Sequence, residues 1–380
     1  MYRSEYYPIL REKFEDLNVL SEIDRTFRKI IEHFDQHENI MISVSGGSDS
    51  DCIVHMLVTY FPEYLYKCHF VFCNTGLEYD ATKRHLEYVE NKYGIRIERI
   101  RGRSVVWAVR TYGIPILNKY KSNMISAYQR GLTFAEKYVF QDGVAKHNVM
   151  RFTEKQRAMV RYATENNIMI SDKCCDISKK NPLKKYQKEH HIDLNVTGER
   201  RAEGGRRALS HKSCYEEHVR GCHKFMPLWW WWWWGDDVKA AFKKAEGIVY
   251  SDCYEIWGFK RTGCVGCPFA LDIKENLQTM QQYEPHMYKA CMAVFGRSYE
   301  LTEMFQCHAH ADRKGKNNTM YGKTYENSPL SKRVECVETG KIYDCMKTAA
   351  EDTGCFATAI TAVCKGKRKT TGGYHWRYVD

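Results

Sequence analysis

Residues 45–50, Ser-Gly-Gly-Ser-Asp-Ser, combine hydroxyl side chains with two adjacent glycines. Residues 39–44 before them are mostly apolar and rich in β-branched side chains, which is typical of a buried strand. Residues 51–60 after them place apolar side chains at helical spacing. Glycine lets backbone N–H groups face an anion, hydroxyls add donors, and the N-terminus of a helix attracts negative charge. This order of features predicts a phosphate-binding loop made of Ser45, Gly46, Gly47, Ser48, Asp49 and Ser50.

Two further polar segments follow predicted strands. Asn-Thr-Gly-Leu-Glu at 74–78 follows the apolar residues 69–73, and the arginine-rich residues 198–208 follow residues 192–197. Strands that alternate with helical segments predict parallel βαβ units, in which ligands bind at the carboxyl ends of the strands. Arginine suits two-pronged contacts to phosphate or sulfate. A strand-end turn and a solvated charged loop are the alternatives for the two segments. The residues predicted to join the phosphate-binding loop are Asn74, Thr75, Gly76, Glu78, Gly198, Arg200 and Glu203.

Sixteen cysteines, in a chain whose first residues form no apolar export signal, favour thiolate chemistry or metal binding over a disulfide framework. Most of these cysteines are expected to be buried thiols. An adjacent pair at 174–175 and a Cys-x-x-Cys pair at 264–267 can supply four thiolates from two distant segments. Such a set fits a [4Fe–4S] cluster or a zinc ion, and a redox disulfide is a third interpretation. The predicted metal ligands are Cys174, Cys175, Cys264 and Cys267, with Cys214 and Cys222 as reserve ligands.

These motifs together resemble those of the phosphoadenosine phosphosulfate (PAPS) reductase family, whose phosphate loop is similar to that of N-type ATP pyrophosphatases. Residues 45–50 resemble the Ser-Gly-Gly-x-Asp-Ser loop, and no Gly-Lys-Ser/Thr follows as it would in a Walker A loop. Residues 74–78 resemble the Asp-Thr-Gly-x-Glu signature, with Asn74 where Asp is usual. Residues 198–204 resemble the Gly-x-Arg-x-x-Glu-Ser segment, with Gly in place of the last Ser. Residues 174–183 resemble the Cys-Cys-x-x-x-Lys-x-x-Pro-Leu stretch of iron–sulfur adenylyl-sulfate reductases.

The resemblance covers about residues 39–270. It implies a Rossmann-like, doubly wound parallel sheet, an adenine nucleotide (ATP or PAPS) accompanied by Mg²⁺, and a [4Fe–4S] cluster rather than zinc. It also implies an enzyme, either a sulfurtransferase or an oxidoreductase, that works with a sulfur donor or a reductant protein. Thioredoxin-linked PAPS reductases use a cysteine in a C-terminal Glu-Cys-Gly-x-His motif, which this sequence lacks. Relatives without that motif include the ATP-dependent sulfurtransferase of DNA phosphorothioation.

The predicted function is therefore adenine-nucleotide-dependent sulfur transfer or reduction, with nucleic acid as one candidate acceptor. Two alternatives stay open. The first is an assimilatory PAPS or adenylyl-sulfate reductase, which would produce sulfite. The second is a DNA-binding regulator whose degenerate domain senses a nucleotide or a redox state and turns over neither ATP nor PAPS.

Residues 333–380 differ in composition and form a separate predicted module. Residues 340–350 and 357–364 predict two helices around a short turn, and residues 372–378 indicate a strand. The arrangement resembles the helix-turn-helix of nuclease-associated modular DNA-binding domains. A small packing appendage with a solvated basic loop is the alternative. The basic residues after the second helix are expected to contact the phosphates of duplex DNA: Lys365, Lys367, Arg368 and Lys369.

A run of six tryptophans at residues 229–234 precedes two aspartates. This segment resembles the Pro-Leu-x-x-Trp-x-x-x-Asp helix start of the same family. We expect the tryptophans to pack against the domain rather than to stack on a base, and Asp236 or Asp237 to cap the helix that follows.

Composition sets the outer limits of the fold and the partners. A chain of 380 residues with 43% hydrophobic content can hold one large α/β domain and an appendage. We predict the domain over residues 1–318, a linker over 319–332 and the module over 333–380. A net charge of +11 favours polyanions such as nucleotides or nucleic acid, with a basic protein lacking such partners as the alternative. No apolar run approaches the length of a membrane span, so we expect a cytoplasmic protein without a membrane partner.

Overall fold

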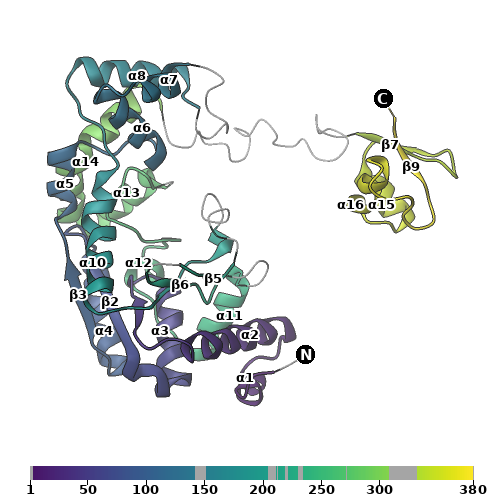
Figure 1. Cartoon of the computed structure of the whole chain (residues 1–380), viewed down its shortest axis with the longest axis horizontal. Helices are drawn as coiled ribbons and strands as arrows, with labels where there is room; N and C mark the ends of the chain where they lie inside the picture. The colour runs from purple at the N-terminus through teal and green to yellow at the C-terminus, as the bar shows by residue number, and fades with distance from the viewer. Residues whose placement is uncertain are drawn as a thin grey trace. The chain divides into compact units, whose positions relative to one another are not determined.

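The computed structural model describes residues 3–141, 151–203, 211, 213–218, 221–229, 234–270, 272–307 and 332–379. Contacts within the chain separate it into two compact units, residues 1–309 and 310–380. Figure 1 shows a sheet with helices in the first unit and a small group of helices and strands in the second. The predicted linker, residues 319–332, lies outside the described residues except for Lys332.

The first unit alternates strands and helices along the chain. Its strands are β1 (Ile40–Ser43), β2 (Cys68–Asn74), β3 (Ile97–Arg101), β4 (Leu194–Thr197), β5 (Tyr215–Glu216) and β6 (His223–Phe225). Its first helices are α1 (Tyr7–Lys13), α2 (Leu17–Phe34), α3 (Ser48–Tyr60), α4 (Asp80–Tyr93), α5 (Val105–Tyr112), α6 (Lys119–Gln129), α7 (Thr133–Phe140) and α8 (Glu154–Glu165). Its later helices are α9 (Lys173–Cys175), α10 (Asn181–Glu189), α11 (Asp236–Glu246), α12 (Asp252–Glu255), α13 (Ile273–Tyr283) and α14 (Pro285–Met304). A π-helical segment, Asp176–Lys180, joins α9 to α10.

Local sequence signals set the starts of several helices. The side chain of Asp16 accepts hydrogen bonds from backbone N–H groups in the first turn of α2, and Ser104 does the same for α5. Thr153 and Gln156 form a reciprocal capping box at the start of α8. Such caps satisfy N–H groups that have no acceptor within the helix.

The central sheet has the strand order β3-β2-β1-β4-β6-β5. All neighbouring strands pair in parallel except β5, which pairs antiparallel with β6 at one edge. The chain moves from β1 outward to β3 on one side and returns to β4 on the other, so the topological switch point lies between β1 and β4. Ligands of such sheets bind at this point, beyond the carboxyl ends of the strands. The predicted Rossmann-like α/β fold is confirmed, and the short strands β5 and β6 extend the predicted sheet.

Alternate side chains of the strands supply two cores. Ile40 of β1 and Phe70 of β2 belong to the larger core, which they share with α2, α3, α4 and α11. Met41 and Val71 belong to a smaller core, to which α10 contributes Tyr186. Because successive strand residues point to opposite faces, both faces of the sheet carry apolar side chains around β1 and β2. Helices therefore pack on both faces there.

A group of helices, α5 to α8, extends the first unit between β3 and β4. Helices α6, α7 and α8 share an apolar core with the end of α14, through side chains such as Ile125, Val139 and Leu301. Helices α5, α13 and α14 form a neighbouring core with Cys174 and Val265. This second core holds both predicted metal-binding segments against the same helices. None of the helices in the described residues is both long enough and apolar enough to cross a bilayer.

The second unit combines two helices with a small sheet. Helices α15 (Met346–Thr353) and α16 (Ala357–Cys364) meet at Gly354, which ends α15 in a left-handed conformation. Strands β7 (Arg333–Cys336), β8 (Ile342–Tyr343) and β9 (Trp376–Val379) form an antiparallel sheet in the order β8-β7-β9. Val334, Ile360 and Trp376 join both layers in one core. Helix α16 and the last strand agree with the sequence prediction. The first helix was predicted over residues 340–350, but it spans Met346–Thr353, and Ile342–Tyr343 of the predicted range form β8. Strand β7 was not predicted.

Glu246, the last residue of α11, ties three helices of the first unit together. Its carboxylate accepts hydrogen bonds from Lys13 at 3.1 Å, from Tyr60 at 2.6 Å and from His55 at 2.9 Å. The Glu246 side chain is only 3% exposed. Burial raises the pKa of this carboxyl, but the hydrogen bonds from His55, Tyr60 and Lys13 outweigh burial and lower the pKa to about 2.

We predict that Glu246→Gln lowers the free energy of unfolding of the first unit by about 2 kcal/mol at pH 7, because charge-assisted hydrogen bonds are lost in a buried site. The folded-state pKa lies below the ordinary value of 4.5. The contribution of the carboxylate is therefore complete above pH 4.5 and declines as the pH falls toward 2. Urea unfolding of both proteins at pH 7 and near pH 3 measures the effect.

Glu32→Gln serves as the control, because Glu32 forms an exposed pair with Lys29 and its loss should change stability by less than about 0.5 kcal/mol. Equal stability of wild type and Glu246→Gln at pH 7 would contradict the prediction. So would a difference that stays the same near pH 3.

Candidate functional site

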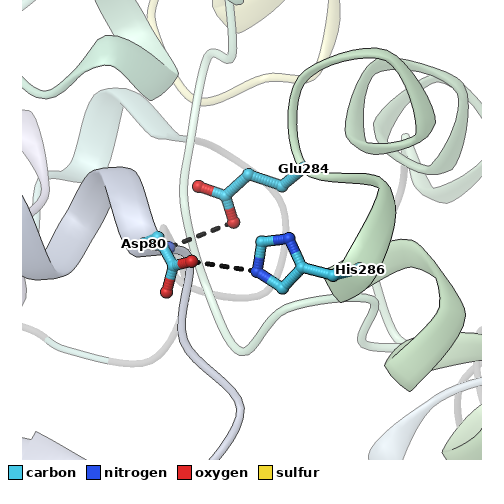
Figure 2. Close-up of side chains that lie close together, drawn as sticks. All are labelled: Asp80, Glu284 and His286. Atoms are coloured by element: carbon cyan, nitrogen blue, oxygen red, sulfur yellow. Dashed lines mark hydrogen bonds and ion pairs between the residues drawn. The ribbon is translucent and has the colours of Figure 1, made fainter.

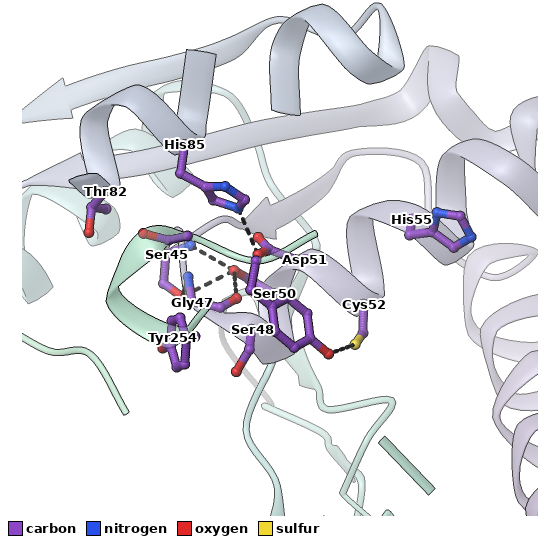
Figure 3. Close-up of polar contacts among 12 residues, drawn as sticks. Ser45, Gly47, Ser48, Ser50, Asp51, Cys52, His55, Thr82, His85 and Tyr254 are labelled. Atoms are coloured by element: carbon purple, nitrogen blue, oxygen red, sulfur yellow. Dashed lines mark hydrogen bonds and ion pairs between the residues drawn. The ribbon is translucent and has the colours of Figure 1, made fainter. Parts of the chain in front are cut away.

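The phosphate-binding loop connects β1 to α3, and its polar side chains face one another (Figure 3). Gly46 has a φ of +65°, a left-handed conformation that glycine adopts without strain. Ser50 Oγ donates to the Gly47 carbonyl at 2.7 Å, and Ser45 Oγ accepts from the Gly47 N–H at 3.2 Å. The Ser45 N–H donates to Ser50 Oγ at 3.3 Å. The serines thus hold the loop in a compact turn through their own hydrogen bonds.

Helix α3 directs its N-terminus into this loop. The Asp51 N–H donates to the Gly47 carbonyl at 3.1 Å, which is the first hydrogen bond of the helix. The N–H groups of Ser48, Asp49 and Ser50 precede this bond and have no acceptor within the helix. These groups and the helix dipole make the loop a suitable site for an anion.

Two hydroxyl groups that the sequence did not indicate lie beside Gly47. A Cβ atom on Gly47 would lie 3.1 Å from the Tyr254 hydroxyl and 3.5 Å from Thr262 Oγ1. The two hydroxyls are hydrogen-bonded at 2.7 Å, and the Thr262 N–H donates to the Tyr254 hydroxyl at 3.1 Å. Figure 3 shows Tyr254 next to Gly47. Because Thr262 is two residues before Cys264, this contact joins the phosphate-binding loop to the cysteine segment.

The carboxylate of Asp49 is neutralised by two cations from other elements. Arg200 Nε and Lys239 Nζ each lie 2.7 Å from Asp49 Oδ1. Lys239 Nζ also donates to Ser48 Oγ at 2.5 Å. Lys239 belongs to α11 and was not predicted, because nothing in its spacing relates it to residues 45–50. Its ammonium group lies at the loop and can contact a bound phosphate.

Arg200 lies where the sequence predicted it, after β4, but it bonds mainly to the protein. Besides Asp49, its guanidinium donates to the Trp234 carbonyl at 3.0 Å and to Asp236 at 3.0 Å. Three of its five N–H donors are thus used, and contact with a nucleotide stays a prediction. The expectation that an aspartate caps α11 is wrong. Gly235 is the N-cap residue and makes no side-chain cap, and Asp236 pairs with Arg200 instead.

The segment after β2 forms a turn held by its own side chains. Asn74 Oδ1 accepts from the Gly76 N–H at 2.8 Å. Glu78 Oε1 accepts from the Thr75 N–H at 3.0 Å and from the Thr75 hydroxyl at 2.7 Å. Burial raises the pKa of Glu78, while the bonds from Thr75 oppose this shift. The amide of Asn74 therefore shapes the turn, and Glu78 supplies the carboxylate at this strand end.

The four predicted cysteine ligands lie close enough to influence one another. Cys174 donates a hydrogen bond to Cys175, which raises the pKa of Cys174 and lowers that of Cys175, and Cys264 and Cys267 interact electrostatically with this pair. Burial raises the pKa of Cys264 to about 11 and that of Cys267 to about 12. A cationic centre would release these thiol protons, since metals bind the thiolate form. The donor set therefore fits a metal–sulfur group.

Among the described residues, one set of three or more ligand atoms lies within 4.8 Å of one another, and it does not include these cysteines. The sulfur-only donor set of the four cysteines suits both predicted centres, a [4Fe–4S] cluster and a zinc ion.

The side chains of Asp80, Glu284 and His286 form that close set (Figure 2). Glu284 accepts from the backbone N–H groups of Asp80 and Ala81 at 3.0 and 2.8 Å, so both of its oxygens cap α4. Asp80 lies 2.9 Å from His286 and 2.7 Å from Lys83. Since these contacts already use the carboxylates, the group fastens the start of α14 to α4 and is not a promising cation site.

One cavity of about 2000 Å³ lies at the switch point of the sheet. It is lined by residues of the phosphate-binding loop, of both other strand ends and of the Cys-x-x-Cys pair. The predicted site residues in its wall are Ser45, Gly47, Ser48, Asp49, Thr75, Glu78, Gly198, Arg200, Cys264 and Cys267. The fold thus brings three separate predicted motifs and one cysteine pair to one cavity.

Other predicted residues lie elsewhere or outside the described part of the chain. The reserve ligand Cys214 is buried in the core beneath α2, and Cys222 lines the cavity on the β6 side. The side chain of Glu203 and residues 230–233 lie outside the description. The two end tryptophans, Trp229 and Trp234, are each 2% exposed. These two pack in the core, as expected.

Comparison with known proteins identifies relatives of the first unit. The phosphoadenosine phosphosulfate reductase domain family matches residues 39–129 and 117–270. An uncharacterized protein of Methanocaldococcus jannaschii is 27% identical over 269 residues, which cover 70% of this chain and 42% of that protein. This chain therefore spans less than half the length of that curated relative.

Two solved structures show more distant similarity. The PAPS reductase from Candida auris, in a phosphate complex, is 15% identical with a TM-score of 0.36, and the match covers 70% of this chain and 96% of that chain. The U34-tRNA thiolase NcsA from Methanococcus maripaludis, with its [4Fe-4S] cluster, is 13% identical with a TM-score of 0.31, over 77% of this chain and 82% of that chain. The family match alone spans more than half of the sequence, from β1 to the residues after Cys267. This chain belongs to the phosphoadenosine phosphosulfate reductase domain family.

Proposed function

We propose that the protein uses an adenine nucleotide, ATP or PAPS, in sulfur transfer or reduction. One observation carries the proposal: the phosphate-binding loop and the Cys264–Cys267 pair line the same cavity. A nucleotide held by the loop would lie in the space that the cysteine thiolates also face. Family membership makes the protein a nucleotide-using enzyme of this class.

The residues of the loop would bind the phosphates of the nucleotide. The N–H groups at the start of α3 offer donors, and Lys239 supplies a positive charge beside Ser48. Tyr254 and Thr262 are close enough to Gly47 to add hydroxyl contacts to the same phosphates. Mg²⁺ would bind together with ATP, coordinated by its phosphate oxygens.

Cys174, Cys175, Cys264 and Cys267 would hold a [4Fe–4S] cluster. Their sulfur-only donor set and the resemblance of residues 174–183 to the iron–sulfur adenylyl-sulfate reductases support this assignment. When bound, such a cluster supplies electron transfer or a binding place for sulfur. Apolar side chains, among them Val265 and Phe295, pack beside Cys174 in the same core.

For the transfer reaction, we propose adenylation of an acceptor carbonyl oxygen by ATP, with release of pyrophosphate. A hydrosulfide ion, provided by a sulfur donor, would then displace AMP and leave a thiocarbonyl on the acceptor. No electrons are exchanged in this sequence. A reductase would instead release sulfite from PAPS, so assays for pyrophosphate and for sulfite separate the two reactions. If the protein forms neither product, the regulator alternative is favoured.

We further propose that the second unit binds duplex DNA. Lys365, Lys367, Arg368 and Lys369 follow α16, and all four are exposed. Among the described residues, none of the four forms an ion pair of 4.0 Å or less, so their charges are available for phosphate contacts. Phe356, the N-cap residue at the start of α16, is also 80% exposed.

The first prediction of this function concerns the loop. Gly47→Ala should weaken ATP and PAPS binding by about 2 kcal/mol, roughly 30-fold, if the new methyl group displaces one charge-assisted hydrogen bond. The methyl carbon would lie 3.1 Å from Ser45 Oγ and from the Tyr254 hydroxyl. Gly296→Ala is the matched control, because the nearest atom lies 3.9 Å away and the residue is in α14. Unchanged affinity of Gly47→Ala in calorimetry would refute nucleotide binding at this loop.

The second prediction concerns the cysteine ligands. Protein purified without oxygen should contain about four irons and four acid-labile sulfides per chain, and Cys264→Ser should lose most of both. Cys222→Ser should keep them, because Cys222 lines the cavity without interacting with the other four cysteines. Metal and sulfide analysis makes the comparison. Stoichiometric zinc without sulfide, or equal iron loss in both variants, would overturn the cluster assignment.

The third prediction concerns the second unit. Duplex DNA affinity should fall with salt, and four phosphate contacts correspond to a log–log slope near about −3.6. Replacing Lys365, Lys367, Arg368 and Lys369 by Ala should flatten this slope while ATP binding stays intact. Fluorescence anisotropy at several salt concentrations measures both proteins. A slope that is the same in wild type and variant would show that these residues do not contact DNA.

A further inference from the structure

The cavity at the switch point continues as a groove along one face of the sheet. Besides the site residues, its lining includes Ser43 of β1, Asn195 of β4 and Lys224 of β6. Leu194 and Phe225 on the same strands belong to the larger core on the opposite face. The floor of the groove is therefore polar at β1, β4 and β6, whereas Val71 of β2 and Ile192 keep apolar side chains on this face beside α10.

The wall of this groove is rich in positive charge. The lining contains ten lysines and arginines, against six aspartates and glutamates. Several of these cations are neutralised within the protein, such as Lys224 by Glu199 at 2.5 Å and Lys239 by Asp49. Lys184, Lys188 and Lys260 form no ion pair among the described residues. The excess charge is thus concentrated on α10 and on the segment before Cys264.

Helix α10 presents its lysines to the groove in a regular stripe. Lys184 and Lys188 belong to α10, and Lys180 is the last residue of the π-helical segment before it and pairs with Asp176 at 2.9 Å. The three lysines are four residues apart, so successive side chains lie about 6 Å apart on one face of this helical stretch. Tyr186, on another face, packs against the sheet. Lys180 and Lys184 also line a second hollow of about 490 Å³, together with Lys173. The stripe therefore continues from the groove onto the outer surface.

We propose that this groove, with the lysine stripe of α10 as its wall, binds the phosphate backbone of a single-stranded nucleic acid. This inference rests on the proposed function and names the class of its acceptor. A cavity of about 2000 Å³ exceeds the roughly 300–1000 Å³ of ordinary small-molecule sites, so it has room for more than one nucleotide. Regularly spaced cations along a groove suit a chain of phosphates better than a single anion.

The form of the groove favours a flexible strand over a protein partner. Lysines in a concave wall can be reached by a single strand, whereas an acidic protein needs a broad exposed surface. Phe269 and His191 also line the cavity and are partly or largely exposed, so they offer ring faces for stacking of bases. A strand lying along α10 would lead one of its nucleotides toward the phosphate-binding loop and the cysteine pair.

The test uses the full-length protein with Lys365, Lys367, Arg368 and Lys369 replaced by Ala, so that the second unit does not contribute. Labelled oligo(dT) and oligo(U) of about 15 nucleotides are titrated at several salt concentrations between about 50 and 200 mM. Adding Lys184→Ala and Lys188→Ala should reduce the magnitude of the log–log salt slope by about 1.4, which corresponds to two phosphate contacts on a single strand. Binding of either oligonucleotide with this dependence supports the proposal, and their affinity ratio tells DNA from RNA.

Lys185→Ala is the matched control. Lys185 is on the same helix, pairs with Glu189 at 3.6 Å and is absent from the lining of both hollows. Its substitution should leave the slope unchanged. Equal effects of the Lys184/Lys188 and Lys185 substitutions would overturn the proposal. Displacement of the oligonucleotide by poly-glutamate of equal charge at equal concentration would also overturn it, because the groove would then bind acidic proteins as well as nucleic acid.

ATP affinity, measured on the same samples, separates this proposal from the proposed function. If ATP still binds but the Lys184/Lys188 substitutions leave the salt slope unchanged, only the groove proposal is contradicted. If the unsubstituted protein does not bind ATP, the proposed function itself is contradicted.

Discussion

The close approach of the β4 end to the first turn of α3 is the constraint on which the rest of the site depends. A Cβ atom on Gly198 would lie 2.9 Å from the backbone N of Ser50 and 3.0 Å from the carbonyl carbon of Asp49, which is closer than a real side chain tolerates. Because glycine lets the two segments touch, Arg200 reaches the carboxylate of Asp49 two residues later. Lys239 reaches the same carboxylate from α11. Packing among three distant segments therefore shapes the anion site before any ligand binds.

Much of the fold was predictable because its signals are local. Apolar strands, a glycine turn and helical spacing lie next to one another in residues 39–60, and parallel strands must bring their carboxyl ends to one edge. Lys239, Tyr254 and Thr262 could not be predicted, because about 200 residues separate them from the loop and only tertiary packing brings them there. The sequence likewise reveals the charge of Arg200 but not that protein acceptors already use most of its donors.

For the cysteines as well, the sequence reveals the residues, but only tertiary packing determines how they are placed. The two pairs were recognisable from their spacing, but the geometry that unites them depends on a continuous helical stretch from α9 to α10. Its π-helical segment follows Cys175 directly, and a Cβ atom on Gly102 would lie 2.3 Å from Pro182 and 2.9 Å from the Ile177 carbonyl. Such segments often occur at functional sites, where an inserted residue changes the direction of nearby side chains. Tight packing against β3 thus fixes the orientation of the adjacent cysteines.

The groove beside α10 stays open because one face of the sheet carries polar side chains, such as Ser43, Asn195 and Lys224. Apolar residues there would require a covering helix, since exposed apolar surface is unfavourable and promotes association. Asn195 accepts a hydrogen bond from Ser43 at 2.8 Å, and Lys224 donates to Glu199 at 2.5 Å, so these polar side chains have partners without such a cover. The sheet can then stay open beside β4 at little cost in stability. Because the opening starts at the switch point, where the nucleotide and cysteine motifs meet, the proposed single strand would reach the reacting groups along the sheet.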